Sequence, residues 1–91
     1  MKKLISSTRL KAKSPRDAFY HLFFLELTDG YIVREESGTG EKVLHTEAWY
    51  RESREETLKL YNRILKEKTN PGRRSPRKYQ IISELSPLGL S

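Results

Sequence analysis

Hydrophobic and polar residues alternate along the first part of the chain with the two-residue period of β-strands. Residues 4–12 alternate in this way and predict a strand with one solvated face. Residues 18–27 are the most apolar stretch, with apolar side chains on both faces at its centre, and predict a central strand. The pair Asp29-Gly30 favours a two-residue turn, so residues 31–33 are expected to return as the partner strand.

The pattern continues with a second turn and two further strands. Residues 35–41 include the tripeptide Gly38-Thr39-Gly40 and predict the turn. Residues 43–50 mix β-branched and aromatic side chains, as is typical of a strand, and residues 78–82 predict a short last strand. From residue 86 onward, a proline and a glycine indicate a flexible tail over residues 86–91.

One helix is predicted between the last two strands. Ser53 and Glu56 have the spacing of a capping box, in which Ser53 accepts a hydrogen bond from the third helical amide. A step of about 100° per residue places apolar side chains on one stripe of the helix and charged side chains opposite. The stripe consists of Leu58, Tyr61, Ile64 and Leu65. Pro71 cannot continue the helical hydrogen bonds, so the helix is expected to end just before it.

These elements predict an α+β fold, an antiparallel β-sheet of four to five strands with one amphipathic helix packed on it. The chain has 91 residues, which is enough for one hydrophobic core, and we expect a single domain over residues 1–85. It has no cysteine, which excludes disulfides and cysteine-ligated zinc and fits a reducing compartment. No segment is apolar enough to span a bilayer, so we expect a cytoplasmic protein that does not bind membranes.

The positive charge of the chain gathers at two places. Residues 1–13 hold five cations and no acid, and residues 66–79 hold six cations and one acid. Each segment therefore has a net charge of +5, against +6 for the whole chain. Such clusters fit a polyanion such as a nucleic-acid backbone, whereas the alternative is that the charge only keeps a small domain soluble. Because the positive charge is concentrated in two segments, we favour binding to a polyanion over a role in solubility alone. The candidate contact residues are Lys11, Lys13, Lys68, Arg73, Arg74, Arg77, Lys78 and Tyr79.

The order of elements and several short motifs resemble the WGR domain over residues 8–82. The motifs are Phe19-Tyr20, Gly38-Thr39, Glu67-Lys68-Thr69 and Lys78-Tyr79. This domain accompanies poly(ADP-ribose) polymerases and also occurs in small bacterial proteins. The resemblance implies an antiparallel sheet with one helix against it and, in the polymerases, a role in gripping DNA ends. Their catalytic activity resides in a separate domain and is not implied here.

The tripeptide that names the WGR domain is replaced in this chain. Arg34-Glu35-Glu36 stands where the resemblance places it, just before Gly38-Thr39, without the tryptophan that stacks on nucleic acid or the arginine that touches its backbone. Two adjacent carboxylates would repel a phosphate at that turn. Contact with DNA is therefore expected to rely on the basic stretch of residues 68–78.

The remaining candidates for chemistry are few. Tyr79 follows two cations and either stacks on a base or anchors the last strand. His21 and His45 are the only histidines, and nothing in their spacing indicates that carboxylates converge on them as metal ligands. No nucleophile, base and orienting group can be assembled, so we expect neither an enzyme nor a cofactor.

Two functions follow from these patterns. The first is a non-catalytic nucleic-acid-binding module that holds DNA through phosphate contacts with little sequence specificity. The alternative is a protein–protein interaction module that docks an acidic partner protein on the same surface or on the sheet edge. The oligomeric state is left open.

Overall fold

The computed structural model of the chain describes residues 2–12, 16–70 and 79–85. Its elements are β1 (Lys3–Ala12), β2 (Ala18–Glu26), β3 (Tyr31–Thr39), β4 (Lys42–Arg51), α1 (Arg54–Thr69) and β5 (Tyr79–Leu85). The strands form one antiparallel sheet in the order β4-β3-β2-β1-β5. The predicted α+β fold is thus confirmed, whereas the predicted tail over residues 86–91 lies outside the described residues.

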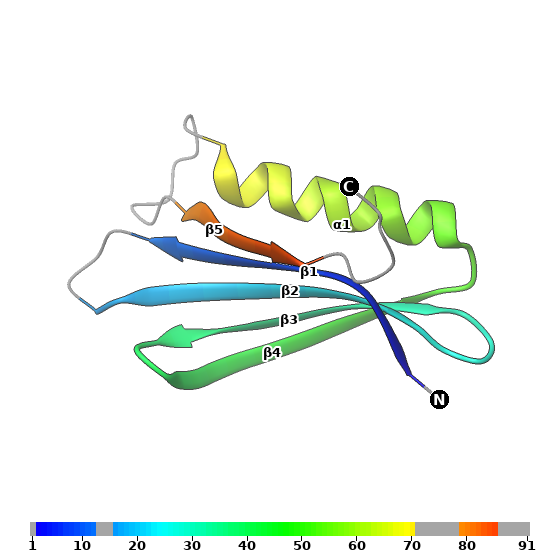
Figure 1. The fold of residues 1–91 in the computed structure, drawn as a ribbon, viewed down its shortest axis with the longest axis horizontal. Coiled ribbons are helices and arrows are strands. Elements are labelled where there is room, and N and C mark those ends of the chain that lie inside the picture. The colour runs from blue at the N-terminus through cyan, green and yellow to red at the C-terminus, as the bar shows by residue number, and fades with distance from the viewer. Residues whose placement is uncertain (1, 13–15, 71–78, 86–91) are drawn as a thin grey trace.

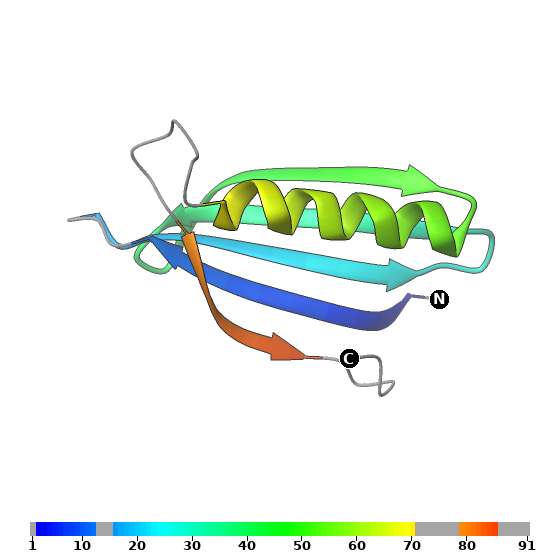
Figure 2. The same cartoon turned by 90° about the horizontal axis from the view of Figure 1, so that it is seen from above.

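The helix α1 lies along one face of the sheet (Figure 1) and, seen from above, runs over the strands (Figure 2). Side chains alternate between the two faces of a strand, so every second residue of β2 points toward α1. The side chains buried between sheet and helix are mainly Ile5, Leu10, Tyr20, Leu22, Phe24, Val33, Leu60, Tyr61 and Ile64. Phe24 lies at the centre of this core and is 1% exposed. No helix in the described part of the chain is long and apolar enough to cross a membrane.

Two buried hydroxyl groups meet inside this core. The Thr8 hydroxyl on β1 and the Tyr61 hydroxyl on α1 are 2.7 Å apart and share a hydrogen bond. The side chains are 3% and 4% exposed, so neither hydroxyl group depends on bulk water for a partner. Burial raises the pKa of Tyr61, and its hydrogen bond with Thr8 partly offsets that rise. The phenol is therefore neutral at physiological pH and can act as a hydrogen-bond donor.

The start of α1 confirms the predicted cap, but the predicted apolar stripe is partly wrong. Ser53 is the N-cap, and its side chain accepts a hydrogen bond from the amide of Glu56 at 3.3 Å. Leu58 is 45% exposed, whereas Leu60 is buried. Thr57 is also fully buried. Its hydroxyl donates a hydrogen bond to the Ser53 carbonyl at 2.7 Å, so the buried polar group has a partner. The buried positions follow helical spacing from this threonine, which rotates the stripe away from Leu58.

The predicted turn over residues 35–41 is also wrong, because β3 continues to Thr39. The turn that joins β3 to β4 contains only Gly40 and Glu41, and Gly40 has φ +60°, where glycine carries no steric penalty. Within β3, Glu35 points toward the helix side of the sheet and Glu36 points toward the opposite side. The two carboxylates therefore do not form a shared acidic turn.

Candidate functional site

Five of the eight predicted contact residues fall outside the part of the chain that the structure describes. Lys13, Arg73, Arg74, Arg77 and Lys78 lie outside the described residues, so the basic patch that they would form stays a prediction. Ala12 and Tyr79, the described residues next to Lys13 and Lys78, pair with each other on neighbouring strands.

The three predicted residues that the structure describes have different surroundings. Lys11 forms an ion pair with Asp17, with 3.0 Å between Nζ and Oδ1. Lys68, in the last turn of α1, places Nζ 4.7 Å from the centre of the Tyr20 ring. Tyr79 is only 7% exposed, and its ring centre lies 5.9 Å from that of Tyr20. Its burial fits the strand-anchoring role of Tyr79, because a base could not reach this ring.

The sheet face turned away from α1 presents a different set of side chains. Phe19, His21 and Phe23 alternate with the core residues of β2 and therefore lie on this second face. Arg9 on β1 pairs across from His21, and Arg34 on β3 pairs across from Phe23. Two cations thus flank a row of three rings on the central strand. We refer to Arg9, Phe19, His21, Phe23 and Arg34 as the open-face surface.

Two of the three rings of the open-face surface, His21 and Phe23, are stacked on each other and only partly buried. His21 and Phe23 lie with their ring centres 4.1 Å apart and their planes inclined by 25°. Both are intermediate in exposure, whereas Phe19 is 4% exposed beneath the Arg9 guanidinium, which lies 4.9 Å from its ring centre. Burial, followed by the nearby Arg9 charge, lowers the pKa of His21, although Glu36 partly opposes this shift. The imidazole is therefore mostly neutral at physiological pH and stacks as an uncharged ring.

Arg34 completes this surface on the neighbouring strand. Its Nη2 donates to the Glu36 carboxylate at 3.1 Å. Its Nε is buried and has no hydrogen-bond partner in the described structure. The Arg34 side chain is 41% exposed, so the outer nitrogens of its guanidinium, rather than the buried Nε, could donate to a phosphate or another acceptor.

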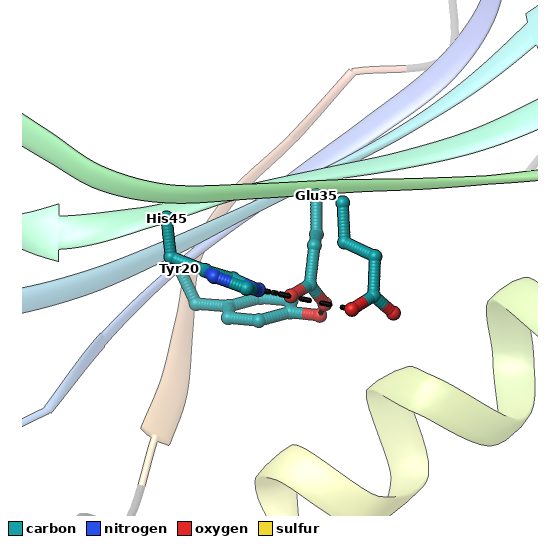
Figure 3. Close-up of polar contacts among 4 residues, drawn as sticks. Tyr20, Glu35 and His45 are labelled. Atoms are coloured by element: carbon teal, nitrogen blue, oxygen red, sulfur yellow. Dashed lines mark hydrogen bonds and ion pairs between the residues drawn. The ribbon is translucent and has the colours of Figure 1, made fainter.

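A second cluster of polar side chains lies on the helix side of the sheet (Figure 3). Glu35 on β3 and Glu47 on β4 are direct cross-strand partners, and His45 lies two residues before Glu47. His45 Nε2 is 3.3 Å from Glu35 Oε1 and 3.8 Å from Glu47 Oε1. The Tyr20 hydroxyl donates a short hydrogen bond to the other oxygen of Glu35, Oε2. Figure 3 shows the phenol and the imidazole both reaching the Glu35 carboxylate.

The electrostatics of this cluster are dominated by the burial of Glu35, which is 9% exposed. Burial raises the pKa of Glu35, the Lys68 ammonium lowers it, and the carboxylate of Glu47 raises it again. The nearby His45 has a smaller lowering effect. The cluster therefore holds two carboxylates and one imidazole close together, and among the described residues the Lys68 ammonium supplies the nearby compensating charge.

Sequence reasoning missed this cluster for an identifiable reason. Convergence of His45 on Glu35 depends on the register of β3 against β4, and the predicted turn over residues 35–41 had removed Glu35 from the sheet. The alternation of Glu35, Ser37 and Thr39 with their neighbours is the signal that could have extended β3.

No protein-family model, curated protein or solved structure matches this chain. The resemblance to the WGR domain therefore stays a prediction that depends on the quoted motifs.

Proposed function

We propose that this protein is a non-catalytic nucleic-acid-binding module that uses the open-face surface together with its basic segments. The observation that carries the proposal is the stacked pair of His21 and Phe23 on the central strand, with Arg9 and Arg34 on the two neighbouring strands. Rings on a sheet face can stack on bases, and adjacent guanidinium groups can bind the phosphates between them.

This arrangement favours a single-stranded ligand over a duplex. Bases in a duplex are stacked on each other and present only their edges, whereas an unpaired base exposes a π-face to a protein ring. Stacking tolerates every base, so we expect little sequence specificity. DNA remains the proposed ligand, held by phosphate contacts to Arg9, Arg34 and the predicted basic contact residues between positions 68 and 78.

A second candidate function is supported by the edge strand β5. Ile81, Ile82 and Leu85 on this strand are 45%, 51% and 54% exposed. β5 is one of the two edge strands of the described sheet, and large apolar side chains on an edge strand can receive a strand or an apolar segment from a partner protein. The alternative proposal is therefore a protein-interaction module that docks its partner at this edge.

The salt dependence of binding tests the role of the two arginines. The double change Arg9→Ala and Arg34→Ala should reduce the slope of log affinity against log salt by about 1.4, since each single-strand phosphate contributes about 0.7. Fluorescence anisotropy with a labelled single-stranded oligonucleotide measures this slope. The matched control is Lys59→Ala with Arg63→Ala, which removes two exposed cations from the solvent side of α1 and should leave the slope unchanged.

Replacement of Phe23 by alanine tests stacking separately from charge. We expect the affinity for the single strand to fall about 5- to 150-fold, the equivalent of about 1–3 kcal/mol for one stacked base. Leu58→Ala removes an exposed apolar side chain from α1, away from the open-face surface, and should have no effect. Equal binding of duplex and single strand, with no effect of Phe23→Ala, would assign the contact to phosphates alone. The triple change Arg73→Ala, Arg74→Ala and Arg77→Ala would then be the informative one, and no binding at low salt would favour the protein-interaction module.

A further inference from the structure

The pairing of Glu35 with Glu47 is unfavourable for the sheet unless a cation lies nearby. Like charges directly opposite each other on neighbouring strands destabilise the pair. The cost is greater where one carboxylate is buried, as Glu35 is. Lys68 supplies one positive charge near Glu35, which leaves the cluster with one net negative charge when both carboxylates are ionised and the imidazole is neutral. A divalent cation would remove this repulsion more completely than the lysine alone.

The separations within the cluster match those of ligands around one metal ion. Two donor atoms that each lie about 2.0–2.2 Å from a tetrahedral zinc ion are about 3.3–3.6 Å apart. The imidazole nitrogen of His45 lies 3.3 Å and 3.8 Å from the two carboxylate oxygens. One donor atom from each of Glu35, His45 and Glu47 lies within 4.8 Å of the others. His45 and Glu47 are about half exposed, so their side chains have room to adjust their rotamers around a metal ion.

The surroundings of Glu35 also fit a ligand carboxylate. Its Oε2 accepts the hydrogen bond of the Tyr20 hydroxyl, which leaves Oε1 directed at His45. Carboxylates that bind a metal are commonly held by such a hydrogen bond on the second oxygen. Tyr20 is 2% exposed and packed in the core, so it holds the carboxylate in one orientation. The single buried ligand is thus positioned before any metal arrives (Figure 3).

We propose that Glu35, His45 and Glu47 form a binding site for a divalent transition-metal ion of the zinc class. One imidazole with two carboxylates is a donor set for zinc, manganese or iron, whereas magnesium and calcium prefer oxygen donors alone. The His45 and Glu47 side chains are 57% and 48% exposed, so solvent can fill the remaining coordination positions. Three protein ligands with an open position resemble the arrangement at which zinc binds water or an exchangeable ligand. This site lies on the helix side of the sheet and is independent of the open-face surface.

Titration with Zn²⁺ in competition with a chromogenic chelator tests the proposal. The parent protein should bind one equivalent, and His45→Ala should weaken binding by more than the roughly 10- to 100-fold that loss of a supporting hydrogen bond costs. Glu47→Gln should weaken it in the same direction. Both side chains are about half exposed, so these variants should keep the thermal stability of the parent. The matched control is His21→Ala, which removes the other histidine from the opposite sheet face and should leave Zn²⁺ affinity unchanged.

Further measurements separate a built site from an incidental one. Tyr20→Phe keeps the buried ring but removes the hydroxyl, and should lower Zn²⁺ affinity roughly 10- to 100-fold. Lys68→Gln should raise the affinity severalfold by removing a competing positive charge. Mg²⁺ should not compete with Zn²⁺ at comparable concentration. In NMR spectra the His45 ring signals should shift with Zn²⁺ while those of His21 stay in place.

Three outcomes would overturn the proposal. The first is no Zn²⁺ binding by the parent at neutral to slightly alkaline pH, which would leave His45 as the partner of an ion pair only. The second is unchanged affinity in His45→Ala. The third is equal loss of affinity in His21→Ala, which would indicate non-specific coordination by any surface histidine.

Discussion

Replacement of Phe24 by alanine should cost about 3–5 kcal/mol of the free energy of unfolding. The side chain is 1% exposed, lies on the central strand and packs against the rings of Tyr31 and Tyr61, with centres 6.0 Å and 5.9 Å away. The cavity would open between sheet and helix, where neighbours on both sides are held by secondary structure. Domains of this size have total stabilities of about 5–15 kcal/mol, so the variant should be partly unfolded at modest temperature. Urea denaturation followed by circular dichroism measures the change.

Phe23→Ala is the matched control, because it removes the same ring from the adjacent position. Phe23 points to the open face and remains partly exposed, so its loss should cost clearly less than that of Phe24. The sequence alone did not separate these two phenylalanines, since both lie in a continuous apolar stretch. Equal destabilisation by the two changes would contradict the assignment of the core to the helix side of the sheet.

Gly38→Ala should destabilise the protein by about 3 kcal/mol for a different reason. A Cβ atom at this position would lie 1.9 Å from the carbonyl oxygen of Lys42, which belongs to the main chain of β4. The register of β3 against β4 shifts at this point, so the two backbones approach closely. Main-chain atoms cannot rotate away, and the strands would have to separate locally. Thermal unfolding should show a large decrease in the midpoint.

Gly40→Ala provides the comparison in the same hairpin. Gly40 has φ +60° and no atom within 4 Å of an added Cβ, so alanine would bear only the conformational cost of about 1–2 kcal/mol. The expected order is therefore Gly38→Ala more destabilising than Gly40→Ala. The reverse order would mean that the backbone conformation of the turn, and not the close approach of the strands, limits this hairpin.

The sequence predicted the existence of every element but not the extent of all of them. Local signals were sufficient for the Ser53 cap and the aromatic central strand, because each depends on neighbouring residues. The predicted two-residue turn at Asp29-Gly30 was too short, because residues 27–30 join β2 to β3, with the Leu27 amide donating to the Gly30 carbonyl at 2.8 Å, and Gly30 does not have a positive φ. β3 was predicted too short because Gly38-Thr39-Gly40 is typical of a turn, and the predicted turn was extended back to Glu35. In the structure Glu35 and Glu36 lie on opposite faces of the sheet. Glu35 is buried on the helix side and accepts a hydrogen bond from Tyr20, whereas Glu36 accepts one from Arg34 on the other face.

The candidate sites depended even more on long-range pairing. Basic composition indicated a polyanion partner, yet composition could not show that Arg9 and Arg34 flank stacked rings, because that arrangement requires three strands in register. The cluster of Glu35, His45 and Glu47 likewise exists only once β3 and β4 are paired. Strand register is set by the whole sheet, so neither arrangement has a local sequence signature.

The hydrogen bond between Thr8 and Tyr61 favours one docking position of α1 on the sheet. Apolar side chains allow a helix to slide or rotate on a sheet at modest cost, since one apolar contact replaces another. A displacement by one turn would separate the two hydroxyls, which are 2.7 Å apart, and break this hydrogen bond. Each buried hydroxyl left without a partner costs about 1–3 kcal/mol. The hydrogen bond therefore favours the observed position of α1 on the sheet, in which Lys68 of the last helical turn lies over the Tyr20 ring.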